Sequence, residues 1–208
     1  MILKILWSET DFTQRLLMGL LIVGFLGLVA GYTYKARLND RFMTITRDKV
    51  YQSGAMPPEV LKERVRQHGI RVVIDLRRPE NGLEEERTTL AELGVSYFSL
   101  PCGQHPKEHV VRAFLEIMDH RENRPVLIHC NNGISRSVIF AAIYRMEYEG
   151  WSNDRARRVA YWQSAFGDFA LGQKKGMFLM NYIPRWHRSA VAAGGELCSM
   201  NELVSIKE

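Results

Sequence analysis

A cysteine, a glycine and an arginine fall at fixed spacing in the segment Val-Leu-Ile-His-Cys-Asn-Asn-Gly-Ile-Ser-Arg-Ser, residues 126–137. Its first three residues are apolar, which predicts a short buried strand that ends beside Cys130. The five residues between Cys130 and Arg136 allow a tight loop whose backbone N–H groups surround one tetrahedral oxyanion. A helix expected to begin at Ile134 adds the positive end of its dipole. The segment therefore predicts an anion site with a thiol at its base.

Residues 130–136, called the cysteine loop below, also favour the reactive form of the thiol. The thiolate is the nucleophile, and a helix N-terminus, N–H donors and the guanidinium of Arg136 all stabilise an anion. The planar guanidinium matches two oxygens of a phosphate group, and Gly133 permits a turn that other residues resist. We expect Ser137 to donate a hydrogen bond to the sulfur, and His129 to brace the loop by hydrogen bonds.

This segment resembles the signature loop of the protein tyrosine phosphatase superfamily, most closely its compact dual-specificity branch, through His129-Cys130-x-x-Gly133-x-x-Arg136-Ser137. The resemblance implies a phosphocysteine intermediate, no metal and no cofactor. It implies catalytic roles for Cys130, Arg136 and Ser137. It implies a substrate-binding loop formed by Asn131, Asn132, Gly133, Ile134, Ser135 and Arg136. Residues 51–54 and 69–77 are also similar to the opening of small phosphatases of this group, so the resemblance covers roughly residues 50–188.

The sequence departs from that family at the proton donor. Many members use an aspartate on a mobile loop before the cysteine to protonate the leaving oxygen, and residues 101–108 contain none. His105 is the best local candidate for a general acid, because an imidazole can donate a proton near neutral pH. Glu108 is expected to stand at the start of the next helix. Asp75 is expected to hold a loop by hydrogen bonds.

The charge of the cysteine loop bears on the substrate. The residues between Cys130 and Arg136 are all neutral, whereas family members that act on inositol phosphates often have Lys or Arg there. This favours phosphotyrosine, phosphoserine or phosphothreonine in proteins. A phosphoinositide or inositol phosphate substrate stays open, because a membrane would bring anionic headgroups close. A module that binds phosphate without turnover is the third hypothesis.

The first apolar stretch, residues 16–34, contains no charged residue. At ~1.5 Å rise per residue its length matches the hydrocarbon core of a bilayer, so it predicts a transmembrane helix. Lys and Arg are more frequent in residues 35–49 than before the stretch, so the positive-inside rule places the C-terminal part in the cytoplasm. Three widely spaced cysteines agree with a reducing compartment. We therefore expect a single-pass membrane protein.

Strand and helix patterns alternate along the rest of the chain, which predicts a single α/β domain with a largely parallel central sheet flanked by helices. Strands are expected at 71–76, 95–100 and 126–128. Helices are expected at 59–68, 84–93, 110–120 and 134–149. The expected organisation is an N-terminal segment 1–15, a transmembrane helix 16–34, a basic connector 35–49, a dual-specificity phosphatase-like domain 50–188 and a flexible tail 189–208.

Composition excludes several other classes of partner. The net charge of +5 comes without a dense basic run, so no nucleic-acid binding is expected. Cys102, His105 and His109 resemble a set of metal ligands, but Pro106 interrupts the helix that would align the two histidines. No metal site is expected.

Overall fold

The computed structural model of this 208-residue chain describes residues 14, 16–31, 40–78, 83–164 and 167–187. The chain divides into two compact units, Met1–Asp40 and Arg41–Glu208. Each unit has its own structure and is described by itself.

In the first unit, residues 16–31 form a helix that contains only apolar residues and glycine. No helix within the described ranges is long and apolar enough to cross a membrane. The transmembrane helix predicted over residues 16–34 is therefore not found, because the described helix stops at Gly31 and a span needs about 20 residues. Residues 32–34 lie outside the described residues.

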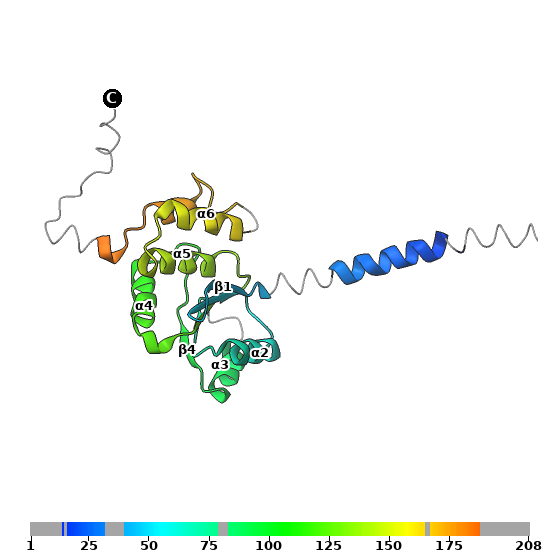
Figure 1. The fold of residues 1–208 in the computed structure, drawn as a ribbon, viewed down its shortest axis with the longest axis horizontal. Coiled ribbons are helices and arrows are strands. Elements are labelled where there is room, and N and C mark those ends of the chain that lie inside the picture. Colours follow the sequence, from blue (N-terminus) through cyan, green and yellow to red (C-terminus); the bar gives the residue numbers. More distant parts are fainter. Residues whose placement is uncertain (1–13, 15, 32–39, 79–82, 165–166, 188–208) are drawn as a thin grey trace, which may run out of the picture. The chain divides into compact units, whose positions relative to one another are not determined.

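The second unit is built on a five-stranded sheet with the order β1-β2-β5-β3-β4. The two edge strands, β1 and β4, are labelled in Figure 1. β1 runs antiparallel to β2, and the other neighbouring strands are parallel. The prediction of a largely parallel central sheet is therefore confirmed. The strands are β1 (Met43–Thr46), β2 (Val50–Ser53), β3 (Val72–Asp75), β4 (Ser96–Ser99) and β5 (Val126–His129).

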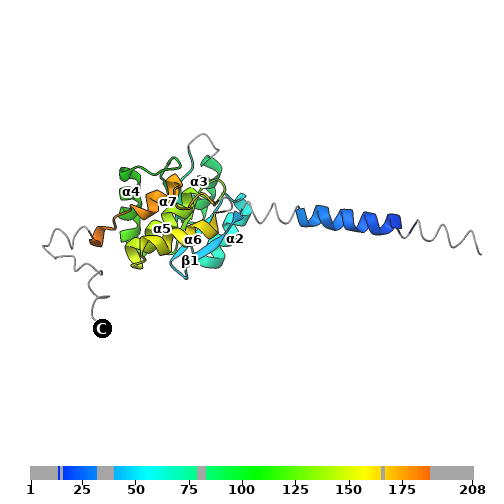
Figure 2. The ribbon, with the colours of Figure 1, turned by 90° about the horizontal axis from the view of Figure 1, so that it is seen from above.

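Helices cover both faces of the sheet. α2 (Pro58–His68) and α3 (Leu83–Glu92) pack on one face. α4 (Glu108–Asp119) and α5 (Arg136–Tyr148) pack on the other face (Figure 1). Figure 2 looks onto the outer helices, α6 and α7, which contact each other and α5. Their bounds are α6 (Asn153–Gln163) and α7 (Lys174–Met180), and a short 3-10 helix, η1 (Arg121–Asn123), follows α4.

The central strands are buried on both faces, which explains why they appear in the sequence as continuous apolar runs. Val73 and Leu127 face α2 and α3. Ile74 and Ile128 face α4 and α5 on the other side, as the alternation of a strand requires. Phe114 of α4 packs edge-to-face against Phe140 of α5, with the ring centroids 4.9 Å apart.

The helices and strands expected between residues 59 and 149 are present, with their ends shifted by a few residues. β1, β2, α6 and α7 were not expected. β1 lies in the range assigned to a basic connector, and the second unit starts at Arg41, before the expected boundary at residue 50. α6 buries only Ala156, Arg157 and Ala160, so its apolar periodicity is weak. The tail, residues 189–208, lies outside the described residues.

Strand register brings the functional segments to one edge of the sheet. His129, the last residue of β5, pairs with Ser53 of β2 on one side and with Asp75 of β3 on the other. The three parallel strands therefore end at the same level. Cys130 follows the central strand at this edge, where ligands of open α/β sheets bind.

Candidate active site

Cys130 lies at the base of the cysteine loop and is only 2% exposed. Its sulfur is 3.3 Å from the hydroxyl oxygen of Ser137, in the first turn of α5. At this distance the hydroxyl can donate a hydrogen bond to a thiolate. The geometry therefore brings together the two side chains that the sequence placed at the sulfur.

Contacts outside the cysteine loop fix its backbone. The carbonyl oxygen of Gly133 accepts a hydrogen bond of 3.0 Å from Nε2 of Gln52, and the carbonyl of Asn131 accepts one of 3.0 Å from the backbone N–H of Ala55. Because C=O and N–H point in opposite directions in a trans peptide, the N–H groups of the residues that follow Asn131 and Gly133 turn the other way. They face the inside of the loop, as anion binding requires.

Gly133 is the position where this turn depends on residue type. Its φ is +65°, and a Cβ there would lie 2.6 Å from the backbone nitrogen of Gly54 and 2.9 Å from the carbonyl carbon of Ser53. Both clashes are with backbone atoms, so a side chain at Gly133 would displace the loop from the edge of β2.

Arg136 begins α5, so its side chain and the helix N-terminus act on the same loop. Its Nη1 donates a 2.7 Å hydrogen bond to the carbonyl oxygen of Leu76, which directly follows β3. Ser135, the residue before the helix, donates a 2.6 Å hydrogen bond to Oε1 of Gln104. The guanidinium and the first turn of the helix are thereby held at the rim, where both stabilise a bound oxyanion.

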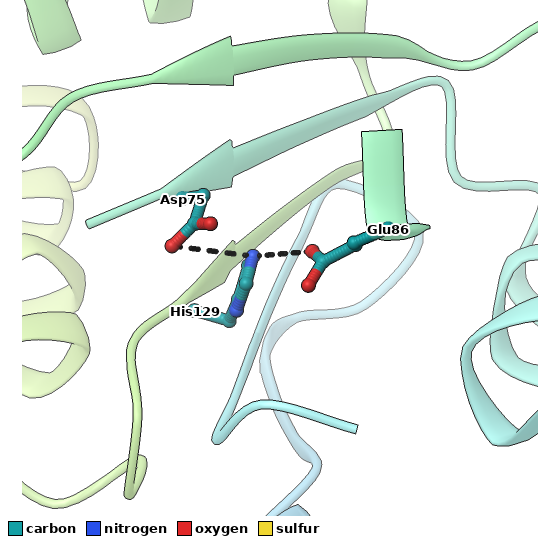
Figure 3. A group of neighbouring side chains, drawn as sticks. All are labelled: Asp75, Glu86 and His129. Atoms are coloured by element: carbon teal, nitrogen blue, oxygen red, sulfur yellow. Dashed lines mark ion pairs between the residues drawn. The ribbon is translucent and has the colours of Figure 1, made fainter. Parts of the chain in front are cut away.

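A buried polar cluster surrounds His129, the residue that precedes the cysteine loop. Figure 3 shows His129 with two members of this cluster, Asp75 and Glu86. Nε2 of His129 lies 2.8 Å from Oε1 of Glu86 and 3.7 Å from Oδ1 of Asp75. Arg77 pairs with Asp75 at 2.8 Å and also with Glu86. The phenol of Tyr97 donates a 2.8 Å hydrogen bond to Asp75. His129 thus lies against side chains from β3 and α3. Its expected role, to brace the loop by hydrogen bonds, stays a prediction.

Charge within this cluster is balanced internally. Burial alone would raise the pKa of Asp75, but hydrogen bonds from Arg77 and the charge of His129 lower it below the usual value. Ligand atoms of Asp75, Glu86 and His129 lie within 4.8 Å of one another, as in a metal site. The guanidinium of Arg77, which contacts both carboxylates, already supplies the positive charge that a metal ion would bring.

The loop expected to supply the general acid contacts the cysteine loop through Gln104, which accepts the hydrogen bond from Ser135. His105 follows Gln104 and is exposed. Its role as proton donor stays a prediction. Cys102 is buried in the same loop, whereas His105 and His109 are exposed, so these three side chains do not share one environment.

Sequence reasoning missed three residues that hold the site: Gln52, Glu86 and Gln104. Only Glu86 carried a usable signal. It shares a helix face with Thr89 and Leu90, which are also buried, at the spacing of one helical turn. The two glutamines lie on separate segments, and nothing in their spacing points to the cysteine loop.

We expect iodoacetamide at about pH 6.5 to label Cys130 and to leave Cys102 unlabelled. Cys130 lies in the cysteine loop with the Ser137 hydroxyl 3.3 Å from its sulfur, whereas burial raises the pKa of Cys102 to about 11 and keeps it neutral. Mass spectrometry of the labelled peptides measures the difference. Cys130→Ser should remove the label, and Arg136→Lys should slow labelling. Equal labelling of both cysteines would contradict the proposed activation.

Glu86→Gln should lower the free energy of unfolding by about 1.5–3 kcal/mol, because it weakens charge-assisted hydrogen bonds in a buried cluster. Turnover of p-nitrophenyl phosphate should fall at least tenfold, because His129 loses its support. Urea unfolding and steady-state kinetics give the two readouts. The matched control is Glu85→Gln on the exposed face of α3, which should stay within about 0.5 kcal/mol. Similar values for the two variants would show that the cluster does not support the loop.

Comparison with known proteins agrees with this geometry. A family model described as "DSP-PTPase phosphatase fused to NAD+ Kinase" matches residues 33–174. The dual specificity protein phosphatase TpbA of Pseudomonas aeruginosa strain UCBPP-PA14 is 29% identical over 87 residues. That alignment covers 41% of this chain and 39% of TpbA, so it spans less than half of the relative's length.

Solved structures share the fold. The crystal structure of P. aeruginosa TpbA superposes with a TM-score of 0.57 and 18% identity, covering 74% of this chain and 91% of TpbA. The catalytic core of the PP-IP phosphatase SIW14 from S. cerevisiae gives a TM-score of 0.60 and 21% identity, covering 74% and 93%. Because the family match extends over more than half of the sequence, the chain belongs to this DSP-PTPase phosphatase family, within the compact dual-specificity branch of the protein tyrosine phosphatase superfamily.

Proposed function

We propose that this phosphatase hydrolyses phosphate esters in proteins, with phosphotyrosine as the preferred substrate and phosphoserine or phosphothreonine as slower ones. The observation that carries the proposal is the chemistry of the two loops at the site. The cysteine loop has no cation before Arg136, and the loop that contacts it through Gln104 has no aspartate.

The first step transfers the phosphoryl group to the enzyme. The Cys130 thiolate attacks phosphorus, an S–P bond forms and the bond from phosphorus to the ester oxygen breaks. Arg136 and the inward N–H groups of the loop stabilise the charge on the three other oxygens. The leaving oxygen takes a proton, for which His105 is the proposed donor.

The second step regenerates the enzyme. Water attacks phosphorus of the phosphocysteine, the P–S bond breaks and inorganic phosphate leaves with the oxygen of that water. The Ser137 hydroxyl, 3.3 Å from the sulfur, donates a hydrogen bond that stabilises the departing thiolate. This contact is suited to the hydrolysis step, because the negative charge returns to sulfur at that point.

The leaving group explains the preference for phosphotyrosine. A phenolate leaves with little protonation, whereas a serine or threonine alkoxide needs a proton in the transition state. The proposed donor, His105, is exposed. Such a donor suits an aryl ester best. The relatedness to TpbA, named a dual specificity protein phosphatase, supports protein substrates.

Inositol pyrophosphates are the alternative substrate class. The structural match to SIW14, named a PP-IP phosphatase, favours it. The phosphate released from a phosphoanhydride is also a good leaving group, so the missing aspartate fits this class as well. The neutral cysteine loop favours the protein substrate.

A substrate panel tests the proposal. Paired peptides with phosphotyrosine or phosphoserine in one sequence should differ in kcat/KM by about 10² or more, which is the usual value of general acid catalysis. His105→Ala should lose more activity on phosphoserine than on phosphotyrosine, and His109→Ala is the matched control from the exposed start of α4. Faster turnover of an inositol pyrophosphate than of any peptide would instead assign the alternative substrate. Equal effects of the two histidine variants would remove His105 as the acid.

We also propose that residues 16–34 hold the protein at a membrane, with the phosphatase unit in the cytoplasm. In support, the large apolar side chains of the helix over residues 16–31 are exposed, and the basic residues are more frequent after the stretch than before it. A reporter that is active only in an oxidising compartment should be silent when fused after Glu208. A strong signal, or release of the protein by a high-salt wash, would refute this arrangement.

A further inference from the structure

An arginine from outside the cysteine loop packs its Cβ beside it. The loop residues between Cys130 and Arg136 are neutral, but Arg41 packs beside Gly133. A Cβ placed on Gly133 would lie 3.1 Å from the Cβ of Arg41. Arg41 lies just before β1, whose antiparallel pairing with β2 brings this part of the chain to the site.

The backbone of Arg41 adopts a conformation that arginine disfavours. Its φ is +36°, in the left-handed region. Asp48 also has a positive φ, but it lies in the turn between β1 and β2, where aspartate tolerates this conformation. No such turn contains Arg41. Unfavourable backbone conformations persist where the surrounding structure imposes them, and they concentrate at functional sites.

The guanidinium of Arg41 keeps its charge available. It is half-buried, and its Nη1 donates a 3.3 Å hydrogen bond to the backbone carbonyl of Gln163, at the end of α6. No ion pair found within the described part of the chain includes Arg41. A guanidinium has five N–H donors. The hydrogen bond to the neutral carbonyl of Gln163 therefore positions this group without neutralising its charge.

We propose that Arg41 determines specificity by binding a second anionic group next to the scissile phosphate. This inference rests on the proposed phosphotyrosine phosphatase function. In a protein substrate the second group is the carboxylate of an aspartate or glutamate beside the phosphotyrosine. The planar guanidinium matches a carboxylate through two parallel hydrogen bonds, which an exposed lysine would not reproduce.

The experiment compares two phosphotyrosine peptides that differ only in acidic or amide residues beside the phosphotyrosine. The readout is the ratio of kcat/KM for the acidic peptide to that for the amide peptide. The wild-type ratio should exceed one. Arg41→Gln should lower it by about ten- to hundredfold, the effect of one charge-assisted hydrogen-bonded pair. Arg41→Lys should lower it less. High salt should also reduce the wild-type ratio.

Arg47→Gln is the matched control, because it removes the same charge from the exposed turn at the far end of β1 and should keep the wild-type ratio. A wild-type ratio near one, or an equal fall in Arg41→Gln and Arg47→Gln, would overturn the proposal. A further arm replaces the peptides with an inositol pyrophosphate. If Arg41→Gln affects only that substrate, the second anion is a phosphate, and the acidic-peptide proposal fails. Failure of the wild type to hydrolyse p-nitrophenyl phosphate would instead refute the proposed function itself.

Discussion

The active site depends on a backbone turn that has no space for a side chain. Gly133 has a positive φ, and a Cβ at this position would lie 2.9 Å from the carbonyl carbon of Ser53, the last residue of β2. This close approach lets Nε2 of Gln52 donate a hydrogen bond to the carbonyl oxygen of Gly133, and the N–H group that follows this carbonyl points the opposite way. The anion site is therefore made of backbone, and its shape is set by how closely the loop lies against the neighbouring strand.

Side chains hold this loop from two directions. On the buried side, Glu86 and Asp75 bracket His129, and Arg77 balances the two carboxylates. On the exposed side, Gln104 accepts a hydrogen bond from the hydroxyl of Ser135. Buried charges are costly unless each has a partner, so the cluster is stable only as a set. Helix α3 is thereby tied to the site through Glu86, which lies 2.8 Å from His129, the residue before Cys130.

Substrate choice follows from what the loops lack as much as from what they contain. In the proposed function, a loop without aspartate makes turnover depend on the leaving group, because phenolate or phosphate leaves far more easily than an alkoxide. In the same proposal, a cysteine loop without a cation before Arg136 leaves charge recognition to its surroundings. Arg41, whose Cβ packs beside Gly133, is the cation proposed for this recognition, and it stands at the start of the phosphatase unit. The proposal thus assigns catalysis and recognition to separate parts of the chain.

The sequence by itself predicted the largely parallel α/β fold, and it assigned the nucleophile to Cys130 and the phosphate clamp to Arg136, assignments that stay predictions. These depend on local spacing: a buried strand, a five-residue loop and a helix start are contiguous, and the apolar runs of β3 and β5 are unambiguous. It did not indicate β1, β2, α6 or α7, or the roles of Arg41, Gln52, Glu86 and Gln104. β1 is an edge strand that is partly exposed, and α6 buries few side chains, so neither shows a clear periodicity. The four side chains come from distant segments and reach the cysteine loop or His129 because the five strands pair in the observed register, which makes their contacts a property of the tertiary structure.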